Sequence, residues 1–429
     1  MTAALLRMNA RTFASLRKHY NYRLFFTGQV VSVSGTWMQN IALAWFVLQL
    51  THSPFAVGVL TVCRFGPSTI LGLPAGVVAD RFDNRLTVIA TQSMSLVLSA
   101  ILAALALTGH ATVWEVYVLA ALGGAVLVLD APSRQGLTFQ MVGRAELPNA
   151  VALNSSLFNV ARIVGPAIGG VLIAGVGVGF CFAVNAVSFL AVLTSLLLMR
   201  KSELIPLVRR GRPTIFRGTA QAMAYVRRTR SVKAVLGMMA IFATLCFNFN
   251  VLLPVLAKQT LHAGPAVFGT LSACFGAGAL VGALISAARG RASWRMLLIG
   301  GAGFGLCELV LAPERTVAAC AVLLFVTGIF FTVYSSNSNA TLQLDTPDHL
   351  RGRVIGFYFY AWNGFAPVGG LLVGWLCERG GTQLAFGVAG AAALGMSALG
   401  LVVMRPRAAA VPVPEPAALV AKPDERVAA

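Results

Sequence analysis

Residues 177–199 read GVGFCFAVNAVSFLAVLTSLLLM, a run of 23 residues without a charged side chain. A bilayer crossing needs about 20 apolar residues, so this stretch is long enough to span a membrane. The rest of the chain has the same character, because 57% of its 429 residues are hydrophobic, 11% are charged and the mean hydropathy is +0.79. A soluble domain has roughly 25% charged residues. The composition therefore excludes a soluble globule and predicts an integral membrane protein.

The length of the apolar runs predicts twelve crossings. Helix is the expected backbone, because lipid offers exposed amides no hydrogen-bond partner. The predicted segments are 23–50, 54–79, 86–108, 112–131, 148–175, 177–199, 232–257, 265–288, 294–312, 316–340, 354–376 and 383–404.

The basic residues are unevenly divided between the two sides that these crossings define. With the N-terminus inside, the inner segments hold 28 of the 33 Lys and Arg residues and the outer loops hold three. The other two, Arg64 and Arg162, fall within apolar runs. Cytoplasmic loops collect Lys and Arg, so we expect a multi-pass protein of a bacterial inner membrane with both termini in the cytoplasm. This rule explains the formal charge of +19 without nucleic-acid binding.

A long inner connection divides the chain into two parts. We expect a cytoplasmic N-terminal segment (1–22), a six-helix bundle (23–199), a basic linker (200–231), a second six-helix bundle (232–404) and a disordered cytoplasmic tail (405–429). Within the linker, apolar residues fall near one helical face. The linker therefore forms either a short amphipathic helix on the membrane surface or a solvated basic connection.

The two halves resemble each other in sequence. Residues 51–58 resemble residues 261–269, and residues 166–172 resemble residues 367–372. The offsets of 200 to 211 residues are about half of the chain. Parallel six-helix repeats of this kind build transporters in which two bundles rock about a central site.

A charged motif follows the second predicted crossing, and it reads Gly76-Val77-Val78-Ala79-Asp80-Arg81-Phe82-Asp83-Asn84-Arg85. An acid and two basic residues at a membrane boundary form either a latch between two conformations or a plain positively charged loop. The motif resembles the loop signature G-x-x-x-D-R-x-x-x-R of the major facilitator superfamily. That resemblance implies twelve transmembrane helices in two pseudo-symmetric six-helix bundles. It also implies that Gly76, Asp80, Arg81 and Arg85 gate transport. We expect Arg81 or Arg85 to pair with Asp130.

A second motif lies in the fifth predicted crossing and reads Gly165-Pro166-Ala167-Ile168-Gly169-Gly170. Proline kinks a helix and glycine allows close packing, so the motif is either an ordinary packing groove or a specialised interface. It resembles the G-P-x-x-G-G signature of the antiporter branch of the superfamily. The resemblance implies that Gly165, Pro166, Gly169 and Gly170 shape the interface between the halves. Residues 21–25, 35–39, 130–135 and 149–155 resemble bacterial drug:proton antiporters, a subfamily that includes macrolide efflux proteins and enterobactin exporters.

Ionisable residues inside a crossing are functional candidates by default. Arg64 and Arg162 lie near mid-bilayer, and each either faces a central cavity and attracts an anionic solute or satisfies helix carbonyls or an internal acid. Glu308 and Glu115 are candidates for carrying a proton, although a lipid-boundary or loop-facing acid explains them equally well. Further candidates for the cavity wall are the polar and amphipathic residues Trp37, Gln39, Asn40, Asn154, Asn159, Trp362 and Asn363.

The resemblance implies a monomeric secondary active exporter of a small organic molecule, such as a drug or a siderophore, driven by proton antiport through alternating access. The alternatives are an importer or lipid transporter on the same fold, or a membrane sensor or scaffold that transports nothing. The sequence contains no phosphate-binding loop, no nucleophile–base arrangement and no metal-ligand spacing. No enzyme activity, cofactor or metal site is therefore expected.

Overall fold

The computed structural model describes residues 13–79, 82–206, 215–290 and 292–403, and every regular element in these ranges is helical. The expected tail at 405–429, much of the expected segment 1–22, and the motif residues Asp80 and Arg81 lie outside the described residues. Ten helical stretches in the described ranges are long and apolar enough to cross a membrane. The predicted fold class, an all-helical membrane protein, is therefore confirmed.

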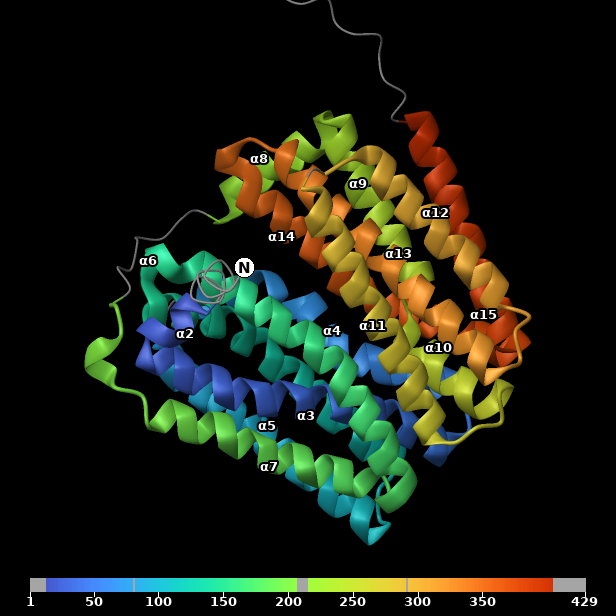
Figure 1. Cartoon of the computed structure of the whole chain (residues 1–429), viewed down its shortest axis with the longest axis horizontal. Helices are drawn as coiled ribbons and strands as arrows, with labels where there is room; N and C mark the ends of the chain where they lie inside the picture. Colours follow the sequence, from blue (N-terminus) through green and yellow to red (C-terminus); the bar gives the residue numbers. More distant parts are fainter. Residues whose placement is uncertain (1–12, 80–81, 207–214, 291, 404–429) are drawn as a thin grey trace, which may run out of the picture.

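In the described residues of the N-terminal half there are one short helix and five long ones. These are α2 (Ala14–Lys18), α3 (Tyr20–Thr51), α4 (Pro54–Ala79), α5 (Asn84–Thr108), α6 (Val113–Val176) and α7 (Val178–Leu197). In Figure 1 they form the blue to green group. Their outward side chains are apolar and exposed, as lipid requires, and include Val171, Val187 and Leu197.

The C-terminal half forms the second group, drawn from yellow-green to red in Figure 1. Its first crossing is irregular and contains two π-helical turns, which often mark functional sites. That crossing consists of α9 (Arg230–Ile241), η2 (Phe242–Cys246), α10 (Phe249–Val255) and η3 (Leu256–Thr260). The helices that follow are α11 (Pro265–Arg289), α12 (Trp294–Leu311), α13 (Val317–Leu344), α14 (Asp348–Gly364) and α15 (Ala366–Val403).

The repeat that the sequence predicts has a counterpart in the backbone. His52 and His262 occupy equivalent places in the two repeats, and both adopt left-handed φ angles, 55° and 50°. In each half this residue ends the first crossing before the next helix begins. We call the end of the molecule that holds these two turns the hairpin end. The opposite end, which holds Asn84 and α8 (Ile215–Arg228), is the linker end.

Two of the ten helical stretches turn back on themselves at glycines. In α6 the break is Gly143, whose φ of +69° a residue with a Cβ rarely adopts. Both ends of α6 therefore lie at the hairpin end. Near its start, Tyr117 donates a hydrogen bond to the carbonyl of Ala56, and Gly170 lies near its end. In α15 the break is at residues 380–381. These two stretches each cover two of the twelve predicted segments.

The linker contains a 3-10 turn, η1 (Lys201–Glu203), and the amphipathic helix α8. Helix α8 packs on the C-terminal half: Ala222 and Val226 are buried, and the hydroxyl of Tyr225 donates to the carbonyl of Asp345 at the end of α13. Of the two interpretations of this linker, the structure has the helix, and its apolar side contacts protein through these residues.

The two halves contact each other most closely through glycines at the hairpin end. A Cβ atom on Gly58 would lie 2.5 Å from the carbonyl oxygen of Gly370, and one on Gly170 would lie 2.8 Å from the Cα of Gly269. The two contacts are equivalent under the sequence repeat, since each joins a residue of one repeat motif to a residue of the other. Only glycine permits backbones to approach this closely.

We predict that Gly170→Ala destabilises the protein by about 1–3 kcal/mol, because the added methyl group must push α11 away. The matched control is Gly175→Ala in the same helix, where a Cβ meets no heavy atom within 4 Å. Thermal unfolding in detergent measures both variants. Equal melting temperatures for the two variants would contradict the tight interface described here.

Candidate functional site

A cavity of about 970 Å³ lies in the N-terminal half. Helices α3 to α7 contribute its wall, and Phe359 of α14 adds an aromatic face from the other half. The cavity extends from Leu119 toward the hairpin end to Leu147 at the linker end. Seven of the sequence-predicted residues line it, namely Trp37, Gln39, Asn40, Arg64, Asp130, Asn154 and Asn159.

Arg64 projects from α4 into this cavity. Its guanidinium lies over the ring of Phe65, 5.4 Å from the ring centroid. Among the described residues it forms no ion pair, since the four ion pairs found there involve other basic residues. The backbone of Arg64 is fixed by close packing on Gly124 of α6. Of the two interpretations that the sequence left open for Arg64, the position at a cavity wall agrees with the first.

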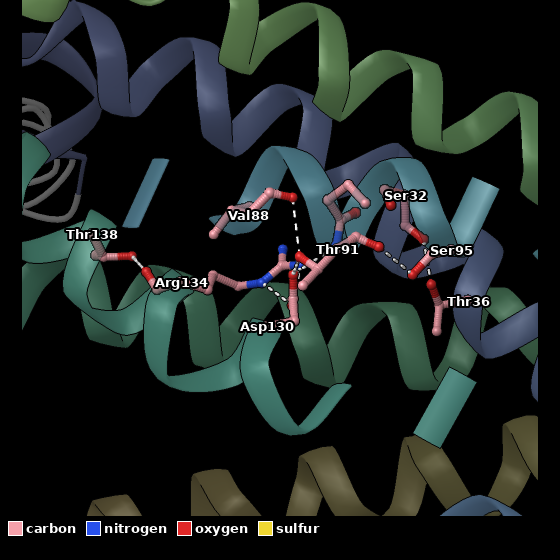
Figure 2. Close-up of polar contacts among 9 residues, drawn as sticks. Ser32, Thr36, Val88, Thr91, Ser95, Asp130, Arg134 and Thr138 are labelled. Atoms are coloured by element: carbon pink, nitrogen blue, oxygen red, sulfur yellow. Dashed lines mark hydrogen bonds and ion pairs between the residues drawn. The ribbon is translucent and has the colours of Figure 1, made fainter. Parts of the chain in front are cut away.

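Asp130 is the centre of a buried polar cluster, which Figure 2 shows. Its Oδ2 accepts hydrogen bonds from Arg134, 2.9 Å from Nε and 2.6 Å from Nη2. Its Oδ1 accepts from Thr91 Oγ1 at 2.7 Å and from Gln92 Nε2 at 2.9 Å. The carboxylate is thus fully hydrogen-bonded by partners on α5 and on its own helix.

The expectation that Arg85 pairs with Asp130 is wrong, while a pairing with Arg81 stays a prediction. Arg81 lies outside the described residues, and Arg85 donates from Nε to the carbonyl of Leu196 at 2.9 Å, and from Nη2 to that of Leu197 at 3.4 Å. Arg85 therefore caps the C-terminal end of α7, where helix carbonyls lack internal partners. The ion pair of Asp130 is made four residues along the same helix, by Arg134.

A second polar cluster orients Gln39. Its Oε1 accepts hydrogen bonds from Ser99 Oγ at 2.8 Å and from Asn185 Nδ2 at 2.6 Å. The Oδ1 of Asn185 in turn accepts from Ser188 Oγ at 3.0 Å. Sequence reasoning missed Ser99, Asn185 and the cavity-lining Gln92. The available signal was the rarity of polar side chains in otherwise apolar runs.

Arg162 does not line the cavity, contrary to one of the two interpretations of its position. Its guanidinium lies over the ring of Trp37 at 5.2 Å, and its Nε is buried without a hydrogen-bond partner. Its carbonyl would meet a Cβ on Gly276 of α11 at 3.1 Å, which places it at the interface between the halves. Arg162 therefore supports the cavity wall through Trp37.

Trp362 and Asn363 also lie away from the main cavity. They line a pocket of about 40 Å³ with Phe65 of α4 and Phe247 of the irregular crossing. The ring centroids of Trp362 and Phe247 are 5.0 Å apart. This part of the C-terminal half is filled by aromatic side chains, whereas the N-terminal half holds the main cavity, with several polar side chains in its wall.

The two candidate acids for proton binding have different environments. Glu115 is exposed and forms a capping box at the start of α6, where its Oε2 accepts from the backbone N–H of Thr112 at 2.7 Å. Glu308 is completely buried, and neither carboxyl oxygen has a hydrogen-bond partner among the residues that the structure describes. It lies one turn beyond Phe304, whose ring centroid is 4.8 Å from that of Phe242.

The glycines of the second motif support both the cavity wall and the interface. A Cβ on Gly165 would lie 2.5 Å from Trp37 Cβ, and one on Gly169 would lie 2.9 Å from Met38 and from Ile41. The carbonyl of Pro166 would be 2.6 Å from a Cβ on Gly269. In the first motif, Gly76 lies near the end of α4.

Polar contacts reinforce the closed hairpin end. Lys258 Nζ donates to the carbonyl of Leu48 at 3.0 Å and lies over the ring of Trp45. Ser53 Oγ donates to the carboxylate of Glu378, at 3.1 Å from Oε1. Both contacts join the N-terminal half to the C-terminal half across the hairpin end.

Comparison with known proteins identifies the kind of protein that carries this cavity. The family model described as transmembrane secretion effector matches residues 10–423. The chain is 24% identical to the staphyloferrin A transporter of Staphylococcus aureus, with 86% of this chain and 92% of that protein covered. It is 21% identical to macrolide efflux protein A of Streptococcus pyogenes, with 86% and 93% covered. It is 24% identical to the enterobactin exporter EntS of Salmonella typhimurium, with 80% and 82% covered.

Solved structures share the fold. A variant of the nucleoside transporter NupG superposes with a TM-score of 0.74 at 11% identity, covering 90% of this chain and 100% of that one. A bacterial homologue of the human lysosomal transporter Spinster, in an inward-facing and unoccupied conformation, gives a TM-score of 0.69 at 11% identity, covering 90% and 95%.

We predict that Asp130→Asn destabilises the protein by about 3 kcal/mol, because Arg134 loses its acceptor and meets an amide donor instead. Asp348→Asn is the matched control, since the ion pair of Asp348 with Arg351 is solvent-exposed and such pairs contribute little. Denaturation in detergent micelles compares the two. A control variant as unstable as Asp130→Asn would show that the buried network adds nothing.

Proposed function

The chain belongs to the transmembrane secretion effector family, and from this premise we propose that it exports a small organic molecule, such as a drug or a siderophore, from the bacterial cytoplasm. The observation that carries the proposal is the cavity of about 970 Å³, whose mainly apolar wall inside a membrane bundle carries a small number of polar and charged side chains. Ligand sites have volumes of this order and few polar groups. Relatives that match most of the chain are named as siderophore and macrolide transporters.

The distribution of charge and of contacts supports export as the direction of transport. The positive-inside rule assigns both termini and the linker end to the cytoplasm of the inner membrane. The contacts of Gly58 with Gly370 and of Lys258 with Leu48 close the hairpin end. The cavity reaches Leu147 at the linker end. We propose that this is the inward-open state, in which a cytoplasmic solute enters.

We propose that a proton drives the return of the transporter, and that Glu308 carries it. Asp130 is saturated by hydrogen bonds and Glu115 caps a helix, so neither is free for this role. A carboxyl group without a partner in an apolar interior is tolerated in its neutral, proton-bound form. Glu308 lies in the hairpin-end half of α12, on the side from which an inward-moving proton arrives.

We propose that the motif residues Gly76, Asp80, Arg81 and Arg85 gate the linker end. The support is the position of Arg85, whose bonds to the last carbonyls of α7 tie the start of α5 to another helix of the same half. A gate of this kind acts within one protomer, so a monomer in the lipid bilayer is sufficient for transport.

We predict that everted membrane vesicles with an imposed proton gradient accumulate at least one of three radiolabelled probes: a macrolide, enterobactin or staphyloferrin A. An uncoupler abolishes the accumulation. Glu308→Gln abolishes accumulation but retains exchange of labelled for unlabelled probe, because a neutral amide cannot release a proton. Glu115→Gln is the control, since glutamine also completes a capping box.

Each other outcome of this assay has a definite meaning. Gradient-driven accumulation by Glu308→Gln would refute the role of Glu308. Accumulation only in right-side-out vesicles would establish an importer. No movement of any probe, in vesicles that contain folded protein, would favour a sensor or scaffold.

A further inference from the structure

We infer that the cavity binds an organic anion, and that Arg64 and Gln39 hold its negatively charged oxygen atoms. The inference rests on the proposed function, because it takes this cavity as the substrate site, and it adds the chemical class of the substrate. Four observations carry it: the charge balance of the cavity, the orientation of one amide, the depth of both groups and the hydroxyl groups beside them.

The charged side chains of the cavity wall leave one positively charged group available to a ligand. Arg64, Asp130 and Arg134 are the charged residues that line the cavity within the described ranges. Asp130 and Arg134 neutralise each other, and each oxygen of the carboxylate already accepts two hydrogen bonds. Arg64 has no such partner in the described part of the chain. A guanidinium presents a planar set of donors that suits a carboxylate or a similar oxyanion.

The amide of Gln39 supplies a second donor of fixed direction. Ser99 and Asn185 both donate to its Oε1. With its oxygen held by these two side chains, the amide has its Nε2 group left to present to the cavity that Gln39 lines. An amide whose orientation is already fixed loses little conformational entropy when it donates hydrogen bonds to a ligand.

Arg64 and the Gln39 amide lie at the same depth. Helices α5 and α6 run antiparallel here, with Thr91 bonded to Asp130. Ser99 lies eight residues further along α5, about 12 Å closer to the hairpin end at 1.5 Å per residue. Because α6 runs in the opposite direction, the residue of α6 at this level is the one eight positions before Asp130, which is residue 122. It lies close to Gly124, which packs on the backbone of Arg64. The two donors therefore form one layer.

The adjacent layer, one turn toward the linker end, consists of hydrogen-bond acceptors. Thr36 and Ser95 line the cavity, and their hydroxyl groups donate to carbonyls of their own helices, those of Ser32 and Thr91, at 2.9 Å each (Figure 2). Their hydroxyl protons are committed, so these oxygens accept hydrogen bonds from a ligand. A solute that pairs an anionic group with a neighbouring hydroxyl group matches both layers.

The test uses purified protein in nanodiscs without any gradient and measures probe binding by protection against thermal unfolding. Citrate carries carboxylates and a hydroxyl group, tricarballylate lacks only that hydroxyl group, and tetraphenylphosphonium is a cation. We expect citrate to bind more tightly than tricarballylate, and tetraphenylphosphonium to bind least. Equal or tighter binding of the cation by the native protein, or no binding of citrate, would overturn the inference.

Variants identify the donors. We predict that Arg64→Gln weakens citrate binding about 10- to 100-fold, as expected for loss of a charge-assisted hydrogen bond. Arg64→Lys keeps the charge but loses the planar fork, so its loss is smaller. Arg315→Gln removes an exposed charge far from the cavity and leaves binding unchanged. Unchanged citrate affinity in Arg64→Gln would refute the role of Arg64.

Gln39→Glu gives the sharpest result. A glutamate oxygen still accepts from Ser99 and Asn185, so the fold is retained, but its second oxygen places a negative charge in the donor layer. We expect citrate binding to be lost and tetraphenylphosphonium binding to be gained.

A failure to export with citrate binding intact would refute the proposed function alone. Export of the macrolide by a protein that binds no citrate would refute this inference alone.

Discussion

The close approach of glycine backbones across the hairpin end is the constraint on which the rest of the structure depends. In lipid there is no hydrophobic drive to associate two apolar helices, so close packing and polar contacts must hold them. Gly58 with Gly370 and Gly170 with Gly269 supply that packing in two repeat-related places. The halves are held together at this end, and the cavity reaches Leu147 at the other. The same motif that joins the halves, at Gly165, also seats Trp37 in the cavity wall.

The two halves share a topology but fill their interiors differently. The N-terminal half keeps a cavity whose polar side chains are held by each other, as Gln39 is by Asn185. The C-terminal half packs aromatic rings around its π-helical turns, with Phe247 stacked on Phe331 at 4.4 Å. A rigid aromatic body can rock against a hollow one without losing its own core. Glu308 lies in the packed half, away from the cavity, so proton and solute would bind at separate places.

The sequence predicted an all-helical membrane protein, because the length of an apolar run is a strong signal. It also singled out Arg64 as a lone charge in an apolar helix, but it left open whether that side chain faces a cavity or satisfies groups within the protein. It did not predict which way Arg162 and Trp362 face. Membrane helices are apolar on all sides, so hydrophobic periodicity, which orients helices in soluble proteins, is nearly absent. The partner of Asp130 was within reach of sequence reasoning, since Arg134 lies four residues away on one helix face. The loop motif, in contrast, favours a partner that is distant in sequence, Arg85.

The two arginines of the cavity differ in whether a nearby acid neutralises them, and this difference couples solute binding to closure of the linker end. Arg134 is neutralised by a fixed acid and is indifferent to what the cavity holds. Arg64 has no acidic partner in the ranges that the structure describes, so water must solvate it while the cavity is open. If the linker end closes and expels that water, an unpaired guanidinium in low dielectric becomes costly. A bound anion removes this cost, whereas an empty cavity does not. Closure is then favoured when solute is present, which prevents an empty cycle from wasting the driving gradient.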